Sequence, residues 1–242
     1  MRKLIDVHCH LYEFSNDRIN EILKDFKVVA VSDDYGSSIK TVKLAEEHEG
    51  ILPCIGIHPW EVGKTTKDEV KAIESLIGRY EVKGIGEVGL DKKFVKNTFN
   101  KQYEFFINFV NLAKEYDLFL NVHAPDAWRE VLDLLRRKDV GRAVIHWFTG
   151  PLELLNEIKE LGYFISINPA AKVQNKHRRV IEEAPLSIIL LESDGPYDYR
   201  GLKLEPELIP ELLTLISEIK KIDIDMLLSR INENFKALIK SV

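Results

Sequence analysis

The chain has 242 residues, of which 45% are hydrophobic and 30% charged, and its formal net charge is −5. This length predicts one large domain or two small ones with a sizeable core, and the negative charge argues against a molecule-wide field that attracts polyanions. Two cysteines, Cys9 and Cys54, are too few for a disulfide framework and favour reduced thiols in the cytoplasm. The start MRKLIDVHCH lacks the apolar core of a signal peptide, and no uncharged apolar run approaches a membrane span, so we expect no membrane partner.

Short apolar segments alternate with longer amphipathic ones along the chain. Eight of the short segments are typical of buried parallel strands, because they are brief and almost continuously apolar. They cover residues 4–7, 28–31, 51–57, 82–85, 118–122, 143–145, 163–167 and 188–191. The sequence therefore predicts eight strands.

Helical periodicity separates these strands. In residues 102–115, Phe105, Phe109, Leu112 and Ala113 recur at steps of three and four. Residues 128–135 and 152–161 behave similarly, and two helical patterns, 207–219 and 224–240, follow the last strand.

Eight strand–helix repeats predict an α/β fold, a (β/α)8 TIM barrel, for which about 250 residues is the usual size. We expect a single domain over residues 1–242, because no linker or low-complexity stretch interrupts the rhythm. An open doubly wound sheet is the structural alternative, but no glycine-rich phosphate loop follows the first strand.

Histidines and acids stand where the predicted strands stop. They are His8, His10, Glu87, His123, His146 and Asp194. In a barrel of parallel strands these stops meet at one mouth. The set is a candidate two-metal site, and it predicts a hydrolase.

The segment IDVHCH places two imidazoles on one face, since alternate side chains of a strand point the same way. His8 and His10 are therefore candidate ligands for a divalent cation, whereas Cys9 faces away and is expected to pack. Asp6 shares the histidine face and is a candidate to orient one of the rings. A pair of core histidines with satisfied hydrogen bonds is the alternative.

Two acids complete the candidate site. Glu87 stands among three glycines in GIGEVGLD, and a carboxylate can bridge two cations as a neutral imidazole cannot; a solvated glutamate in a turn is the alternative. Asp194 follows the last strand, with Glu192 on the same face, and can bind metal or accept a proton from water. Its alternative is an N-cap of the turn at Gly195-Pro196.

The remaining histidines have weaker signals. His58, in HPW after the third strand, is a candidate substrate contact or proton donor, or equally a loop histidine held by the turn at Pro59. His48 and His177 have many charged neighbours, and we predict both at the surface.

Seven motifs follow one another almost from end to end: IDVHCH, GIHPWE, GIGEVGLD, VHAPDA, VIHWFTG, GYFISINPA and LLESDGPY. In this combination the chain resembles the TatD-type DNase family of the metal-dependent hydrolase superfamily. The resemblance implies a TIM barrel of the metal-dependent hydrolase type with two divalent cations. One cation would be held by His8, His10 and Asp194, the other by His123 and His146, and Glu87 would bridge them.

The resemblance also implies a function. It implies hydrolysis of phosphodiester bonds in DNA, typically from the 3′ end, with His58 lining the substrate site. Asp194 is our candidate for orienting or deprotonating the attacking water, so Asp194 and Glu87 are the candidate catalytic residues. Mg²⁺, Mn²⁺ and Zn²⁺ all remain candidates, because a histidine-rich site suits transition metals at least as well as Mg²⁺.

The chain departs from the family pattern beside His123. Family members commonly carry a serine and an arginine there, and this chain has Ala124 and Pro125. An arginine would suit a phosphate, so its absence weakens the phosphodiester hypothesis. Replacement charges could come from residues that are otherwise solvated, namely Lys92, Lys93, Lys172 and Arg200. Ser193 replaces the usual threonine and keeps its hydroxyl.

Three functions thus compete. The first is a nuclease acting on DNA, with RNA as a further candidate substrate. The second is a metal-dependent ester or amide hydrolase, such as a misacylated-tRNA deacylase, since the same metals polarise a carbonyl. The third is a non-catalytic binding protein. No feature of the sequence marks a dimer face, and a monomer is compatible with it.

Overall fold

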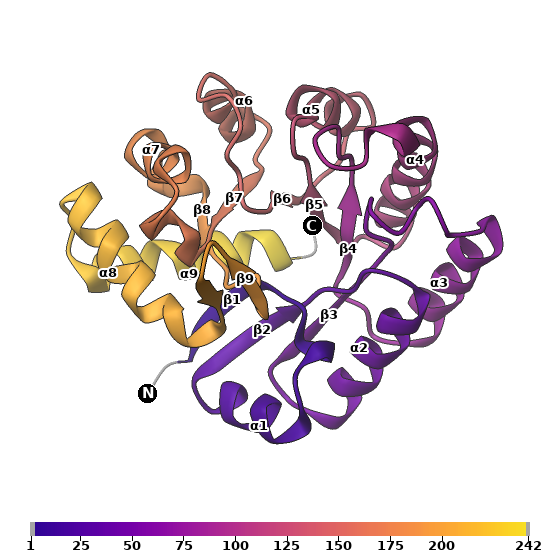
Figure 1. Cartoon of the computed structure of the whole chain (residues 1–242), viewed down its shortest axis with the longest axis horizontal. Helices are drawn as coiled ribbons and strands as arrows, with labels where there is room; N and C mark the ends of the chain where they lie inside the picture. Colours follow the sequence, from indigo (N-terminus) through magenta and orange to yellow (C-terminus); the bar gives the residue numbers. More distant parts are fainter. Residues whose placement is uncertain (1–2, 241–242) are drawn as a thin grey trace.

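A parallel sheet of eight strands forms the centre of the computed structural model, which describes residues 3–240 (Figure 1). The strands lie side by side in chain order, each parallel to the next. Their bounds are β1 Leu4–Cys9, β2 Phe26–Ala30, β3 Ile51–Ile55, β4 Gly84–Gly89, β5 Phe119–His123, β6 Ala143–Ile145, β7 Phe164–Ile167 and β8 Ile189–Leu191. This order confirms the predicted TIM barrel, and the open doubly wound alternative is wrong.

Helices surround the sheet and connect its strands (Figure 1). They are α1 Asn16–Asp25, α2 Tyr35–Glu47, α3 Lys67–Arg79, α4 Phe99–Glu115, α5 Trp128–Arg137, α6 Leu154–Glu160, α7 Asn175–Glu183, α8 Ile209–Lys220 and α9 Ile224–Ile239. Short 3₁₀ turns lie at Leu11–Glu13, Lys96–Thr98, Pro169–Lys172, Leu186–Ile188 and Pro206–Leu208. After β8, a small hairpin pairs β9 Tyr197–Tyr199 with β10 Leu202–Leu204. Within residues 3–240, no helix combines the length and apolar composition needed to cross a membrane.

Local sequence signals set where helices begin and which face they bury. Thr66 caps α3, because its hydroxyl accepts the Glu69 backbone N–H while the Glu69 carboxylate accepts the Thr66 N–H. In α4 the predicted apolar face is confirmed, with Phe105 and Phe109 both buried. The helices therefore present apolar faces to the sheet, which leaves the strand ends for polar residues.

Two backbone hydrogen bonds join the first strand to the segment after the last. The N–H of Asp194 donates to the His8 carbonyl at 2.9 Å, and the N–H of His10 donates to the Gly195 carbonyl at 2.8 Å. These bonds lie at the carboxyl end of β1, where the candidate site residues stand. The contact that closes the barrel between β1 and the segment after β8, which we call the seam, is therefore made by residues of the candidate site and their neighbours.

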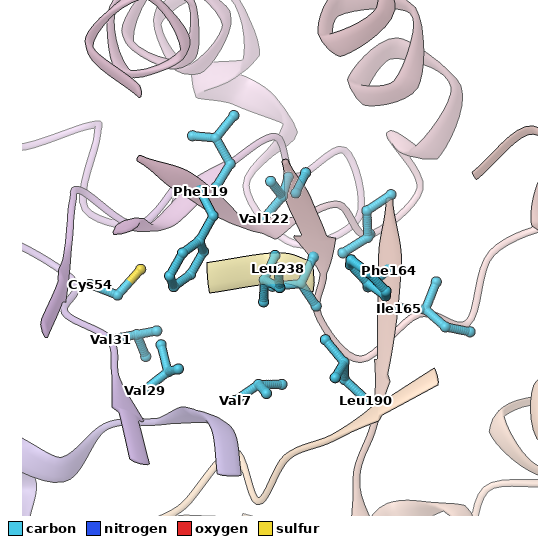
Figure 2. Close-up of a cluster of buried hydrophobic side chains, with 14 of the residues drawn as sticks. Val7, Val29, Val31, Cys54, Phe119, Val122, Phe164, Ile165, Leu190 and Leu238 are labelled. Carbon is cyan, nitrogen blue, oxygen red and sulfur yellow. The ribbon is translucent and has the colours of Figure 1, made fainter. Parts of the chain in front are cut away.

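Helix α9 covers the opposite end of the barrel. The Asn234 amide donates to the carbonyls of Leu186 and Ile189, at the start of β8, at 2.8 Å each. Arg142, directly before β6, donates to the Lys240 carbonyl at 2.8 Å. Figure 2 shows Leu238 of α9 between buried side chains of several strands, Phe119 and Leu190 among them. Because α9 closes the amino-terminal end, the carboxyl-terminal end remains available for chemistry.

One strand boundary differs from its prediction in a way that matters for the site. The fourth strand was predicted over residues 82–85, whereas β4 runs over Gly84–Gly89. Glu87 therefore lies within the strand rather than in a turn after it. The glycines concealed this extension, because the apolar pattern stops at Ile85.

Candidate metal centre

The six predicted site residues meet at the mouth of the barrel. Each stands on a strand or just after its end. His8 lies in β1 and His10 directly after it, Glu87 lies in β4, His123 lies in β5, His146 follows β6 and Asp194 follows β8. All are buried except His10, which is partly buried. A left-handed backbone at Asp194, with φ of 57°, accompanies the turn that carries this acid.

The carboxylate of Glu87 stands at the centre of the cluster. Its Oε1 lies 2.7 Å from His123 Nδ1 and 2.8 Å from His146 Nε2. Its Oε2 lies 3.2 Å from His8 Nε2 and 3.6 Å from His10 Nε2. The two oxygens therefore face two different pairs of imidazoles, which is the arrangement that a bridging carboxylate requires.

Asp194 completes the group on the β1 side. Its Oδ1 lies 3.3 Å from His8 Nε2 and 3.5 Å from His10 Nε2. The two Nε2 atoms lie 3.4 Å apart. Three donor atoms thus converge on one point, and atoms of His8, His10 and Asp194 all lie within 4.8 Å of one another.

Oxygen acceptors on the outer side of the His8 and His123 rings determine which ring nitrogen keeps its lone pair. Asn121 Oδ1 lies 2.8 Å from His8 Nδ1, and the Asn121 amide is fixed because its Nδ2 donates to the Val7 carbonyl at 2.8 Å. Asp91 Oδ2 lies 3.0 Å from His123 Nε2. An oxygen that only accepts requires a proton on the facing nitrogen, so the inward Nε2 of His8 and Nδ1 of His123 keep lone pairs when the rings are neutral.

The other two histidines have an acid near the outer ring nitrogen, although within residues 3–240 that nitrogen makes no hydrogen bond. His10 Nδ1 lies 3.3 Å from Asp33 Oδ1, and His146 Nδ1 lies 3.7 Å from Glu192 Oε1. Each inward Nε2 therefore faces the cluster with an acid behind the ring. Carboxylates or amides behind the outer nitrogen are typical of metal-binding histidines, because they fix the tautomer.

His58 has the opposite polarity. Its Nδ1 accepts the backbone N–H of Trp60 at 3.1 Å, so the proton of the neutral ring lies on Nε2. That Nε2 lies 3.2 Å from Glu87 Oε1 and 3.3 Å from His123 Nδ1. The structure thus brings His58 into the cluster, but its inward nitrogen is a donor rather than a lone pair.

Charges within the cluster reinforce one another. Burial by itself raises the pKa of Glu87, but the charges of His146, His58 and His8 lower that pKa well below its usual value. Burial and His146 lower the pKa of His8, yet Glu87 and Asp194 raise it to about 10 overall. The ionised acids among the imidazoles can hold either protons or metal cations at this position, and a cation that binds displaces the imidazole protons. The donor set therefore fits divalent metal ions.

Comparison with known proteins decides the family. The sequence model described as "TatD related DNase" matches residues 5–240. The chain belongs to the TatD family. It is 29% identical to the uncharacterized metal-dependent hydrolase YabD of Bacillus subtilis, over 98% of this chain and 99% of the relative. It is also 29% identical to human deoxyribonuclease TATDN3, over 96% of this chain and 92% of the relative.

A solved structure agrees on the fold. The TatD homologue YjjV of Escherichia coli superposes with a TM-score of 0.88 at 24% identity, covering 98% of this chain and 97% of that one. As a TatD-family member with this cluster, the protein is a metal-dependent hydrolase.

Several residues around the TatD cluster were missed in the sequence. Asn121, Asp91 and Asp33 each place an oxygen near the outer ring nitrogen of a cluster histidine. Glu192, which the sequence suggested only as a residue on the same strand face as Asp194, accepts the Trp147 N–H at 2.9 Å and contacts the Ser166 hydroxyl at 2.5 Å. Asn121 had a usable signal, because it lies two residues before His123 and so shares its face. Asp33 had a weaker one, as an acid following the second strand.

Two expectations are wrong. Asp6 orients no imidazole, since its Oδ1 accepts the backbone N–H groups of His8 at 3.1 Å and Ser193 at 2.9 Å. His177 is not at the surface: it is fully buried in α7, on the same helical face as Val180 and Ile181. Cys9 is buried and packs as predicted, with its thiol near the Gly195 carbonyl.

Proposed function

We propose that this protein hydrolyses phosphodiester bonds of DNA from the 3′ end with a pair of divalent cations. His8, His10 and Asp194 would hold one cation, His123 and His146 would hold the other, and Glu87 would be shared between them. The observation that carries the proposal is the position of the Glu87 carboxylate, whose two oxygens each face a separate pair of imidazoles.

The chemistry follows from two metals and two protein groups. When bound, paired divalent cations activate water and stabilise charge on a transferring phosphoryl group. Asp194 accepts the proton of the attacking water, because its side chain is 11% exposed whereas that of Glu87 is 2% exposed and faces only the imidazoles. His58 donates its Nε2 proton to an oxygen of the substrate, in keeping with its reversed tautomer.

Relatives support DNA as the substrate. The family is described by its DNase activity, and the human relative is named a deoxyribonuclease. Four imidazoles beside two carboxylates suit Mn²⁺ or Zn²⁺ at least as well as Mg²⁺, which prefers oxygen ligands. All three ions therefore belong in the assay.

The test is digestion of a single-stranded oligodeoxynucleotide labelled at its 5′ end, with each ion in turn. The wild type is expected to give a ladder that shortens from the 3′ end. Glu87→Ala and Asp194→Asn are expected to lose most of this activity, while Glu233→Gln, a surface acid of α9 paired with Arg230, retains it. A wild type that leaves the oligonucleotide intact with every ion refutes the proposal.

A second candidate, ester or amide hydrolysis, is favoured by the missing cation beside His123. Ala124 is buried where the family pattern expects a polar residue. Lys92 and Lys172, two possible replacements for the arginine, pair with Glu130 and Glu211. Faster turnover of a misacylated tRNA than of any oligonucleotide would favour this function over the nuclease.

A further inference from the structure

Exposed aromatic rings lie beside the candidate metal centre on its β3–β4 side. Trp60 follows β3 and Phe94 follows β4; their side chains are 43% and 59% exposed. The two rings meet edge to face, with centroids 5.7 Å apart. The Trp60 ring also lies 5.2 Å from the His58 ring and 6.3 Å from the His123 ring. We call Trp60 and Phe94 the Trp60 platform.

One buried carboxylate holds this platform against the centre. Asp91 Oδ2 accepts the Trp60 indole N–H at 2.6 Å and lies 3.0 Å from His123 Nε2. Asp91 Oδ1 accepts the backbone N–H groups of Lys93 and Phe94 at 2.8 and 2.7 Å. The exposed rings are thus fixed rather than loosely attached, since the acid that supports a candidate metal ligand also supports them.

A second group of rings lies on the β6–β8 side. Trp147 directly follows His146, and its ring centroid lies 5.1 Å from that of Tyr199 and 6.1 Å from that of Tyr197. The Trp147 indole donates to Gln174 at 3.0 Å, and Tyr197 is 44% exposed. We call Trp147, Tyr197 and Tyr199 the Trp147 platform.

The two platforms belong to well-separated strands of the barrel. In the strand order, β3 and β4 lie four places from β7 and β8. Figure 1 shows the β9 hairpin, which carries Tyr197 and Tyr199, in front of β1 and β2 and next to β8, while β3 and β4 lie farther round the barrel. A chain that enters the mouth therefore meets two separate sets of planar side chains.

Charge alone cannot hold a polyanion here. The molecule carries a net charge of −5, and the nearby Lys92 and Lys172 pair with Glu130 and Glu211. The exposed cations Lys93 and Arg200 lie over rings of the platforms themselves, 4.7 Å from the Phe94 centroid and 5.2 Å from the Tyr199 centroid. Aromatic surface with a cation beside it is the combination that binds single-stranded nucleic acid, because every base has a stackable face.

We propose that the Trp60 platform and the Trp147 platform stack against unpaired nucleobases on the two sides of the bond to be cut, and so select single-stranded nucleic acid ends. This inference rests on the proposed nuclease function, which it makes more specific. Bases inside a duplex are already stacked on one another, so a blunt duplex offers the platforms little to bind.

The test measures binding and cutting separately. Binding is followed by the anisotropy of a fluorescein-labelled single-stranded oligothymidylate with phosphorothioate links, which slow hydrolysis, and of an abasic oligonucleotide with the same backbone. Phe94→Ala and Tyr197→Ala remove one exposed ring from each platform. Tyr116→Ala is the matched control, because Tyr116 is a 38% exposed ring at the end of α4, three residues before β5 begins and so at the other end of the barrel. Trp60→Phe keeps a ring but removes the donor to Asp91.

Stacking predicts that Phe94→Ala and Tyr197→Ala each weaken binding of the oligothymidylate about five- to 150-fold, while Tyr116→Ala binds like the wild type. The abasic chain is expected to bind the wild type far more weakly than the thymine chain, and Trp60→Phe is expected to keep most of the affinity. Equal wild-type affinity for the two oligonucleotides would overturn the inference, as would unchanged binding by both ring variants.

Cutting of an unmodified oligothymidylate distinguishes the two proposals. A wild type that binds through the platforms but cuts no oligonucleotide refutes the nuclease and leaves stacking intact. A wild type that cuts the oligonucleotide while Phe94→Ala and Tyr197→Ala bind it normally refutes stacking and leaves the nuclease intact.

Discussion

The backbone N–H of Asp194 donates to the carbonyl of His8 at 2.9 Å, and this bond joins the end of the barrel to its beginning. Both residues are also proposed to hold the same cation. The seam therefore sets the separation of two candidate metal-ligand side chains that lie 186 positions apart in the chain. The paired bond from the His10 N–H to the Gly195 carbonyl does the same for their neighbours. The hydrogen bonds that close the barrel therefore also bring the candidate ligands His8 and Asp194 together.

The first prediction concerns Asp6, which supports this seam. Its Oδ1 accepts the N–H groups of His8 and Ser193, one from each side. Asp6→Ala leaves both buried donors unpaired and is expected to lower the free energy of unfolding by about 1–3 kcal/mol for each donor. Urea unfolding measures this, and Asp6→Asn, which keeps an acceptor, is expected to lose less. Equal stability of the alanine variant and wild type would show that the seam does not depend on Asp6.

The second prediction separates His58 from the metal ligands. His58→Phe removes an inward donor and no inward lone pair, so we expect turnover to fall about 100-fold or more while metal content stays at the wild-type level. His146→Phe, which removes an inward lone pair, is expected to lose metal as well. Metal analysis and turnover on the same preparations give both values. Metal loss in His58→Phe would instead identify His58 as a ligand.

The third prediction tests the amide behind His8. Asn121→Leu removes the acceptor of His8 Nδ1 and is expected to weaken metal affinity about 10- to 100-fold. Asn234→Leu is the matched control, since Asn234 is also buried and also donates to backbone carbonyls, but at the far end of the barrel. Both variants are expected to lose stability, whereas only Asn121→Leu should lose metal. A competition titration with a metal indicator measures the affinity.

The fourth prediction concerns pH. Burial lowers the pKa of His177 from 6.5 to about 3. The folded state therefore keeps this ring neutral where the unfolded state protonates it, so its contribution to stability is present above pH 6.5 and is lost as pH falls towards 3. Between these values the loss approaches about 1.4 kcal/mol per pH unit.

Replacing His177 by leucine removes this titration. Urea unfolding of His177→Leu and wild type, both in chelator and from pH 7 down to pH 4, is expected to show a shallower loss of stability for the variant. Parallel losses in the two proteins would contradict the assignment of a neutral, buried ring.

Much of the barrel could be predicted from the sequence because buried parallel strands are short apolar runs. The rule that site residues follow strand ends identified the residues that the structure brings together in the candidate metal centre. The failures have physical causes. The prediction ends the fourth strand too early because glycine carries no hydropathy signal. In the structure β4 continues through its glycines to Glu87 and beyond. His177 was misplaced because its charged neighbours outweighed the helical spacing that groups it with Val180 and Ile181.

The residues that support the ligands were harder to predict. Asn121 shares a strand face with His123, so local spacing would have found it. The contacts of Asp91 with Trp60 and of Asp33 with Tyr12 join loops from different strands. Such contacts depend on the closed barrel, and no local pattern contains them.

The bridging role of Glu87 is the central claim, and metal content per chain tests it most directly. Wild type and Glu87→Ala are loaded with Mn²⁺ or Zn²⁺, freed of excess ion and analysed for metal. We predict two ions in the wild type and at most one in Glu87→Ala, because without the shared carboxylate no negative charge between the two cations offsets their repulsion. Two ions retained in Glu87→Ala would contradict the bridge and with it the proposed centre.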